Sequence, residues 1–111
     1  MKKLKKLWPL FLTLSILVIL IILSLSKPKV ILFYGNTCPH CEKVEEYLKA
    51  NPSKTKFRKL EVYDNKQNAV LMATKAKICG INSDSIGVPF LFNGKTCLLG
   101  DADITNWFSQ Q

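Results

Sequence analysis

The chain lacks several features that would assign it to a common class of protein. It has no internal repeat, and it has no low-complexity segment outside one apolar stretch near the N-terminus. No aromatic residues interleave with its lysines and arginines in a stacking pattern, so the formal net charge of +8 does not indicate nucleic-acid binding. The length of 111 residues limits it to one folded domain.

Residues 7–26 contain no charged residue, and leucine and isoleucine dominate them. A helix of this length, rising about 1.5 Å per residue, reaches about 30 Å, the thickness of the hydrocarbon core of a bilayer. Residues 23–26 contain no pair of small residues of the kind that signal peptidase cleaves, which favours an anchor over a signal peptide. We therefore expect residues 1–28 to form a lysine cluster with a transmembrane signal anchor, and residues 29–111 to form the folded domain.

Lysines flank this apolar stretch on both sides. Four precede it, namely Lys2, Lys3, Lys5 and Lys6, and two follow it, namely Lys27 and Lys29. The excess on the N-terminal side predicts a cytoplasmic N-terminus and an extracytoplasmic domain. The expected location is the cell membrane, with a single pass and bilayer contact through residues 7–26.

Residues 29–111 alternate between strand and helix patterns. Strands are predicted over residues 30–34, 57–63, 88–92 and 95–99, and helices over about 39–50, about 67–79 and from Asp101 or Asp103 onward. Asn93-Gly94 between two apolar runs predicts the two-residue turn of a hairpin. The order β-α-β-α-β-β-α predicts a three-layer α/β sandwich.

Helical spacing predicts which side chains face the core. In the first of these helices Cys41, Val44 and Leu48 share one face, and charged residues take the other: Glu42, Glu45, Glu46 and Lys49. In the second helix the expected apolar stripe is Val70 or Leu71, Ala73 or Thr74, and Ile78. In the last helix it is Ile104, Trp107 and Phe108.

Two cysteines, Cys38 and Cys41, carry the chemistry that the sequence predicts. They stand where a buried strand turns into a helix, with Pro39 in the first helical turn, where its missing N–H costs nothing. A free cysteine, with a pKa of about 8.5, is mostly protonated at neutral pH, so disulfide exchange needs a stabilised thiolate. Unpaired N–H groups and the positive end of the helix dipole favour the thiolate at Cys38. Cys38 is then the attacking thiol and Cys41 the resolving thiol.

His40, between the two cysteines, is expected to tune the pair. An imidazole beside a thiolate can donate a hydrogen bond, and when protonated it adds a positive charge. Both effects favour the reduced form and make the disulfide a stronger oxidant.

Other interpretations of Cys38 and Cys41 are a structural disulfide, a zinc site and an inert pair. Structural zinc needs four ligands, usually from paired knuckles, and Cys79 and Cys97 form no second knuckle. A disulfide that closes only four residues stabilises little. Redox catalysis without a metal or organic cofactor is therefore favoured, with electrons passing to or from a membrane redox partner. A non-enzymatic carrier of copper or zinc for a membrane protein is the alternative.

Val88-Pro89 is the second element of the predicted site. A proline that begins a strand here would place its backbone beside the two cysteines. A cis peptide would remove a donor and open an edge against which a substrate strand can pair. A trans proline that begins an edge strand is the alternative.

Three segments resemble the thioredoxin superfamily, and specifically its glutaredoxin branch. Residues 30–41 end in Thr37-Cys38-Pro39-His40-Cys41, residues 88–95 begin with Val88-Pro89, and Gly100 precedes Asp101-Ala102-Asp103-Ile104. They look like the glutaredoxin stretches T-C-P-x-C, V-P-x-x-F-x-x-G and G-G-x-D-D-L, over nearly all of residues 29–109. The resemblance implies a thioredoxin-like fold and a cis Val88–Pro89 bond. It also implies Cys38 as the nucleophile, Cys41 as the resolving cysteine, and substrate contacts from Thr37, Val88 and Pro89.

The chain also departs from that pattern. Glutaredoxins usually carry a lysine shortly before the first cysteine, a threonine before Val-Pro, and a Gly-Gly pair. Here those positions read Tyr34-Gly35-Asn36, Gly87 and Leu99-Gly100. The contacts that would hold glutathione are thus partly missing, which argues against a glutathione-dependent glutaredoxin and favours protein thiols and disulfides as substrates. The C-P-H-C centre is similar to that of the DsbA oxidases, although the chain has no room for their large helical insertion.

Cys79 and Cys97 complete an even cysteine count. An oxidising compartment favours pairing, and a structural disulfide between the second helix and the last strand is feasible. Two buried free thiols are the alternative. Cys97 occupies an alternate strand position, and an outward-facing side chain there would leave the two cysteines unpaired.

Overall fold

The computed structural model describes residues 2–25 and 28–111, and within them it confirms the predicted order of elements. The elements are α1 (Lys2–Leu25), β1 (Val30–Tyr34), α2 (Pro39–Ala50), β2 (Phe57–Glu61), α3 (Lys66–Ile78), a short 3-10 helix (Ser83–Ser85), β3 (Phe90–Phe92), β4 (Cys97–Leu99) and α4 (Asp101–Ser109). Met1, Ser26 and Lys27 lie outside the described residues. Ser26 is the last residue of the predicted anchor, and Lys27 belongs to its basic flank.

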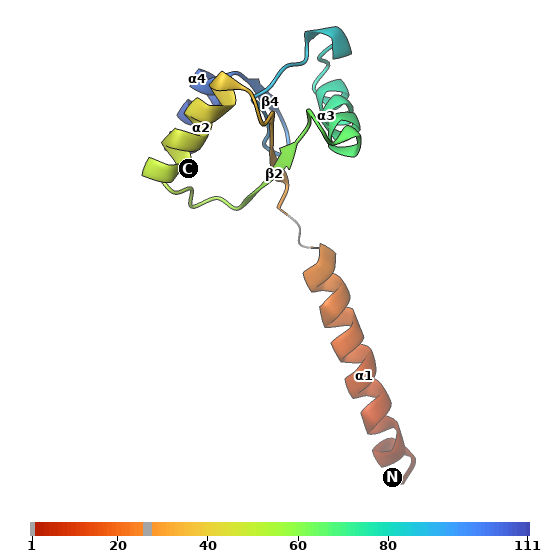
Figure 1. The fold of residues 1–111 in the computed structure, drawn as a ribbon. Coiled ribbons are helices and arrows are strands. Elements are labelled where there is room, and N and C mark those ends of the chain that lie inside the picture. The colour runs from red at the N-terminus through yellow and green to blue at the C-terminus, as the bar shows by residue number, and fades with distance from the viewer. Residues whose placement is uncertain (1, 26–27) are drawn as a thin grey trace.

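The four strands form one mixed sheet with the order β2-β1-β3-β4. β1 runs parallel to β2 and antiparallel to β3, and β3 pairs with β4 in an antiparallel hairpin. Figure 1 shows α2 and α4 together on one side of the sheet and α3 on the other. The predicted three-layer α/β sandwich is confirmed.

β1 supplies the centre of the core because both of its faces are covered. Val30 and Leu32 join Val44 of α2 and Ile104 of α4 in one apolar cluster, while alternate residues of the same strand, such as Phe33, join the cluster under α3. This explains why residues 30–34 read as a continuous apolar run rather than an alternating one. The strand is thereby fixed in position, and the cysteines follow directly after it.

The face of α3 that packs on the sheet differs from the prediction. Val70 and Ile78 are 67% and 62% exposed, whereas Ala76 is fully buried. Ala69, Met72 and Ala76 follow one another at helical spacing and contact the core. Of the predicted alternatives Val70 and Leu71, Leu71 packs against the core, whereas the prediction was wrong at Ile78. Small side chains such as Ala76 let the helix lie close to the sheet.

Three strand ends also differ from the prediction: β2 ends at Glu61, β3 begins at Phe90 and β4 begins at Cys97, each two residues inside its predicted bound. β2 ends at Glu61 because its carboxylate accepts the N–H groups of Tyr63, at 2.5 Å, and of Asp64, at 3.0 Å, and so turns the chain. The hairpin turn centres on Gly94 and Lys95, one residue later than predicted. Asn93 donates its N–H to the Thr96 carbonyl at 3.1 Å, and its side-chain oxygen accepts the N–H groups of Lys95 at 2.9 Å and Thr96 at 2.8 Å. Gly94 has a positive φ, which glycine adopts readily.

α1 is long and apolar enough to cross a membrane. Its most apolar window has a mean hydropathy of 2.6, and none of its described residues is buried. The lysines that precede the apolar stretch are part of the same helix. A signal sequence near an N-terminus has the same length and composition.

Candidate active site

Cys38 caps the N-terminus of α2. Its Sγ accepts the backbone N–H of Cys41 at 3.1 Å, and Pro39 occupies the first helical position. Its own N–H donates to the Gly35 carbonyl at 3.3 Å, which closes the tight turn that follows β1. The sulfur of Cys38 therefore takes the position at which a side-chain acceptor normally satisfies the first free N–H groups of a helix.

Cys38 and Cys41 form a disulfide, with their Cα atoms 5.2 Å apart. Cys38 is 9% exposed and Cys41 4% exposed. Both cysteines are thus buried, and Cys38 is the slightly more exposed residue of the two.

Val88 and Pro89 lie against this disulfide. The Val88–Pro89 peptide is cis, as the resemblance implied, and the Val88 carbonyl oxygen is 3.6 Å from Cys38 Sγ. Pro89 itself is buried, and its carbonyl accepts the N–H of Gly100 at 3.1 Å. The group presented to the sulfur is therefore the Val88 backbone and not the proline ring.

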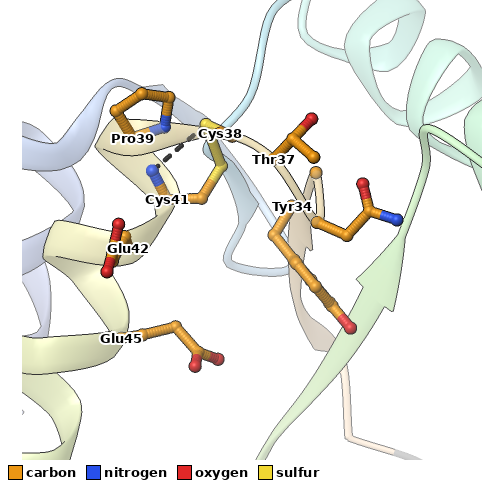
Figure 2. Close-up of a pocket in the computed structure, with 9 residues that line it drawn as sticks. Tyr34, Thr37, Cys38, Pro39, Cys41, Glu42 and Glu45 are labelled. Atoms are coloured by element: carbon orange, nitrogen blue, oxygen red, sulfur yellow. Dashed lines mark hydrogen bonds between the residues drawn. A yellow bond between two sulfur atoms is a disulfide. The ribbon is translucent and has the colours of Figure 1, made fainter.

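A hollow of about 370 Å³ opens beside Cys38 and Cys41 (Figure 2). It lies between the start of α2 and the end of β1, and Thr37 is exposed on its wall. It is lined by Tyr34, Gly35, Asn36, Thr37, Cys38, Pro39, Cys41, Glu42 and Glu45. The hollow thus brings Thr37, Pro39 and both cysteines together, while Val88 and Pro89 approach the sulfur from outside it.

His40 points to a different part of the molecule. Its Nδ1 is 3.1 Å from Oδ1 of Asp101, the first residue of α4, and Lys43 Nζ is 4.0 Å from the other carboxylate oxygen. The pKa of Asp101 is lowered below the usual aspartate value. Desolvation raises it, but that effect is outweighed by hydrogen bonds from its own backbone N–H and from His40 and by the charges of Lys43 and His40. Within the described chain, the side-chain hydrogen bond of His40 is with Asp101 and not with Cys38.

The loop before Cys38 is held from the end of β2. The Asn36 side-chain amide donates to the Asp64 carboxylate, and Gly35 lies so close to the Tyr63 ring that a Cβ would overlap it. Desolvation raises the pKa of Glu61, but hydrogen bonds from Asp64, Tyr63, Asn36 and Asn65 outweigh it and lower that pKa. The carboxylate form of Glu61 therefore organises the turn that supports the cysteines.

Several residues at or beside the site did not emerge from the sequence as site residues, among them Glu42, Glu45, Asn36 and Asp101. Glu42 and Glu45 were assigned to a solvent face, yet both line the hollow. Their spacing offered a signal, since each stands four residues after one of the cysteines and so one helical turn along. Asn36 and Asp101 gave no comparable signal, because their partners are 28 and 61 residues away in the chain.

Cys79 and Cys97 also form a disulfide in the structure, with Cα atoms 6.1 Å apart. Cys79 caps the C-terminus of α3 and Cys97 begins β4. Both pack against the core cluster under α3. The part of the chain that the structure describes contains no free cysteine, and no group of three or more His, Cys, Asp or Glu side chains in it could hold a metal ion.

No protein-family model and no curated protein matches this chain. Solved structures do match, among them glutaredoxins. The glutaredoxin of Archaeoglobus fulgidus is 20% identical with a TM-score of 0.53, over 78% of this chain and 90% of that one. The holo form of glutaredoxin C1 from Populus tremula x tremuloides is 20% identical with a TM-score of 0.52, over 78% of each chain. The glutaredoxin of a buckwheat glutaredoxin–glutathione complex is 13% identical with a TM-score of 0.53, over 74% of this chain and 69% of that one.

These matches define the class of fold. The folded domain is thioredoxin-like and resembles glutaredoxins, as predicted, and it carries a Cys-x-x-Cys pair at the start of α2. A long apolar helix precedes it.

Proposed function

We propose that this protein is a thiol–disulfide oxidoreductase that exchanges disulfides with protein thiols through Cys38 and Cys41. The observation that carries the proposal is the position of Cys38 Sγ, which accepts the Cys41 N–H at 3.1 Å at the N-terminus of α2 and borders an open hollow. The same N–H stabilises a thiolate when the disulfide is reduced, because a charged acceptor strengthens the hydrogen bond.

The exchange proceeds in two steps. A substrate thiolate attacks Cys38 Sγ, the Cys38–Cys41 bond breaks, and the electron pair of that bond leaves on Cys41, which takes up a proton. A second substrate thiolate then attacks the substrate sulfur of the mixed disulfide and releases Cys38 as a thiolate. Two electrons have passed from the substrate to the cysteine pair, and the substrate has gained a disulfide. The reverse sequence reduces a substrate disulfide, with Cys41 as the resolving thiol.

Separate cysteine variants of the full chain in detergent test these roles. Cys38→Ser should abolish turnover of a protein disulfide substrate such as insulin, while Cys41→Ser should accumulate a stable mixed disulfide on Cys38. The double variant Cys79→Ser/Cys97→Ser is the matched control and should keep turnover. Full turnover by Cys38→Ser would overturn the proposal.

The reduction potential of the pair sets the direction of exchange. A reduction potential of about −120 mV would make the protein an oxidase, and a reduction potential of about −270 mV would make it a reductant. A histidine inside the Cys-x-x-Cys motif favours oxidation when its charge stabilises the thiolate. Equilibration with glutathione buffers, followed by alkylation of the free thiols, measures this potential.

We further propose that α1 anchors the domain in the cell membrane with the N-terminus in the cytoplasm. The mean hydropathy of 2.6 and the four lysines ahead of the apolar stretch support an anchor in this orientation. A membrane redox partner would then exchange electrons with the pair. Association with membranes should resist carbonate and vanish when residues 1–26 are removed. Recovery of the chain without these residues from intact cells would instead mark them as a cleaved signal.

A further inference from the structure

The part of the chain that the structure describes lines the hollow beside the disulfide with acidic side chains and with no basic one. Glu42 and Glu45 are the only charged residues among the described residues that line it, and both project from α2 (Figure 2). The remaining lining residues are neutral. In a chain with a formal net charge of +8, the charged side chains that line this hollow are thus acidic.

The two glutamates differ in how far their charges are neutralised. The Glu45 carboxylate forms a close ion pair with Lys59, whose Nζ also lies 4.9 Å from the centroid of the Tyr34 ring. Glu42 is exposed and forms no ion pair with any residue in the described part of the chain. The basic residues near it in sequence, His40 and Lys43, are directed to Asp101 instead. Glu42 is thus a charge at the site that still has no partner.

Helix geometry places this charge within reach of a substrate side chain. Glu42 stands four residues after Cys38, which is about 6 Å along a helix axis at about 1.5 Å per residue. A substrate joined to Cys38 by a mixed disulfide holds its neighbouring side chains at that range. Lysine and arginine are long enough to span it, and arginine can bind a carboxylate through two parallel hydrogen bonds.

We propose that the hollow selects protein substrates in which a lysine or arginine neighbours the reacting cysteine, and that Glu42 binds this cationic side chain. The inference rests on the proposed function, because it assigns the substrate class of the same disulfide. Glutathione has the opposite character, since it carries two carboxylates and one ammonium group. The Glu42 carboxylate that attracts a cationic peptide therefore repels glutathione.

Paired peptides test the charge preference on the reduced full-length chain in non-ionic detergent. Each peptide carries one cysteine, blocked as a mixed disulfide with thionitrobenzoate, and the cysteine is flanked either by lysines or by glutamates. Attack by Cys38 forms the peptide–Cys38 disulfide and releases coloured thionitrobenzoate. We expect a rate constant about two- to fivefold larger for the lysine peptide, the effect of one exposed charge pair, and a smaller difference at high salt.

Substitutions on α2 assign the preference to Glu42. Glu42→Gln should reduce the ratio of the two rate constants, and Glu42→Lys should invert it and speed the reaction with the glutathione mixed disulfide. Glu46→Lys is the matched control, because Glu46 is exposed on the same helix but does not line the hollow. It should leave the ratio unchanged.

The outcomes separate this inference from the function on which it rests. Equal rates with both peptides, or a ratio that Glu46→Lys shifts as much as Glu42→Lys does, would overturn the charge preference while disulfide exchange stands. Release of thionitrobenzoate no faster than with the Cys38→Ser variant would overturn the proposed function itself.

Discussion

The imidazole Nδ1 of His40 lies 3.1 Å from Oδ1 of Asp101, and this contact joins the first turn of α2 to the first turn of α4. It connects the middle of the Cys-x-x-Cys motif to a residue 61 positions later in the chain. The side chain that was expected to act on the Cys38 sulfur is therefore held by a carboxylate. Through that carboxylate, α4 influences how the imidazole is placed beside the disulfide.

Removing the imidazole should raise the pKa of Asp101. Desolvation already raises that pKa, and the hydrogen bond and charge of His40 are among the interactions that lower it, so His40→Ala leaves desolvation less opposed. The carbon-13 shift of the Asp101 carboxyl, followed by NMR as a function of pH, measures the change. Lys95→Ala removes a lysine of the hairpin turn and should leave the titration unchanged. An identical Asp101 pKa in His40→Ala would contradict the contact.

Acid should destabilise the fold through Glu61. Its folded pKa is below its unfolded value, so its contribution to the free energy of unfolding is complete above the unfolded pKa and is lost as the pH falls through the folded pKa. Glu61→Gln should therefore be less stable than the wild type near neutral pH, and the difference should shrink in acid. Urea unfolding at several pH values measures it. A difference that stays constant down to about pH 2 would argue against a lowered Glu61 pKa.

The disulfide between Cys79 and Cys97 should stabilise the domain. It closes a loop between residues 18 apart in sequence, for which loop entropy predicts about 3 kcal/mol. The double variant Cys79→Ala/Cys97→Ala should lower the free energy of unfolding by about that amount and keep disulfide exchange at Cys38. Chemical unfolding in the absence of reductant measures it. Equal stability of variant and wild type would show that the two thiols are not bonded in solution.

Two isoleucines test the packing of the helices. Ile104 is fully buried, so Ile104→Ala should lower the free energy of unfolding by about 3 kcal/mol. Ile78, which the sequence pattern assigned to the core, is 62% exposed. Ile78→Ala should change the free energy of unfolding by about 0.5 kcal/mol or less. Equal losses in the two variants would place Ile78 in the core after all.

Local sequence patterns predicted the elements well where one strong signal determined them. The apolar run of β1, the proline after Cys38 and the apolar residues on either side of Asn93 are such signals, and the predicted order of strands and helices was correct. The buried face of α3 was predicted poorly, because several faces of that helix carry apolar residues and only contact with the sheet selects among them.

The cysteine pair could be identified from the sequence, but its surroundings could not. Cys38 and Cys41 are neighbours on one helical turn, so their juxtaposition is local. Asp101 and Asp64 reach the site from other elements, and a pattern along the chain carries no signal for such contacts. The orientation of His40 depends on one of them, which is why its partner was not predicted.

The path of the chain through β1 has a consequence for an anchored protein. The backbone enters the sheet at Val30 and reaches Cys38 only after the strand has ended, so the tether and the sulfurs stand at opposite ends of the central strand. At about 3.3 Å per residue, the four steps from Val30 to Tyr34 separate the two ends of β1 by about 13 Å. In a chain anchored through α1 as proposed, the central strand therefore lies between the point of attachment and the disulfide.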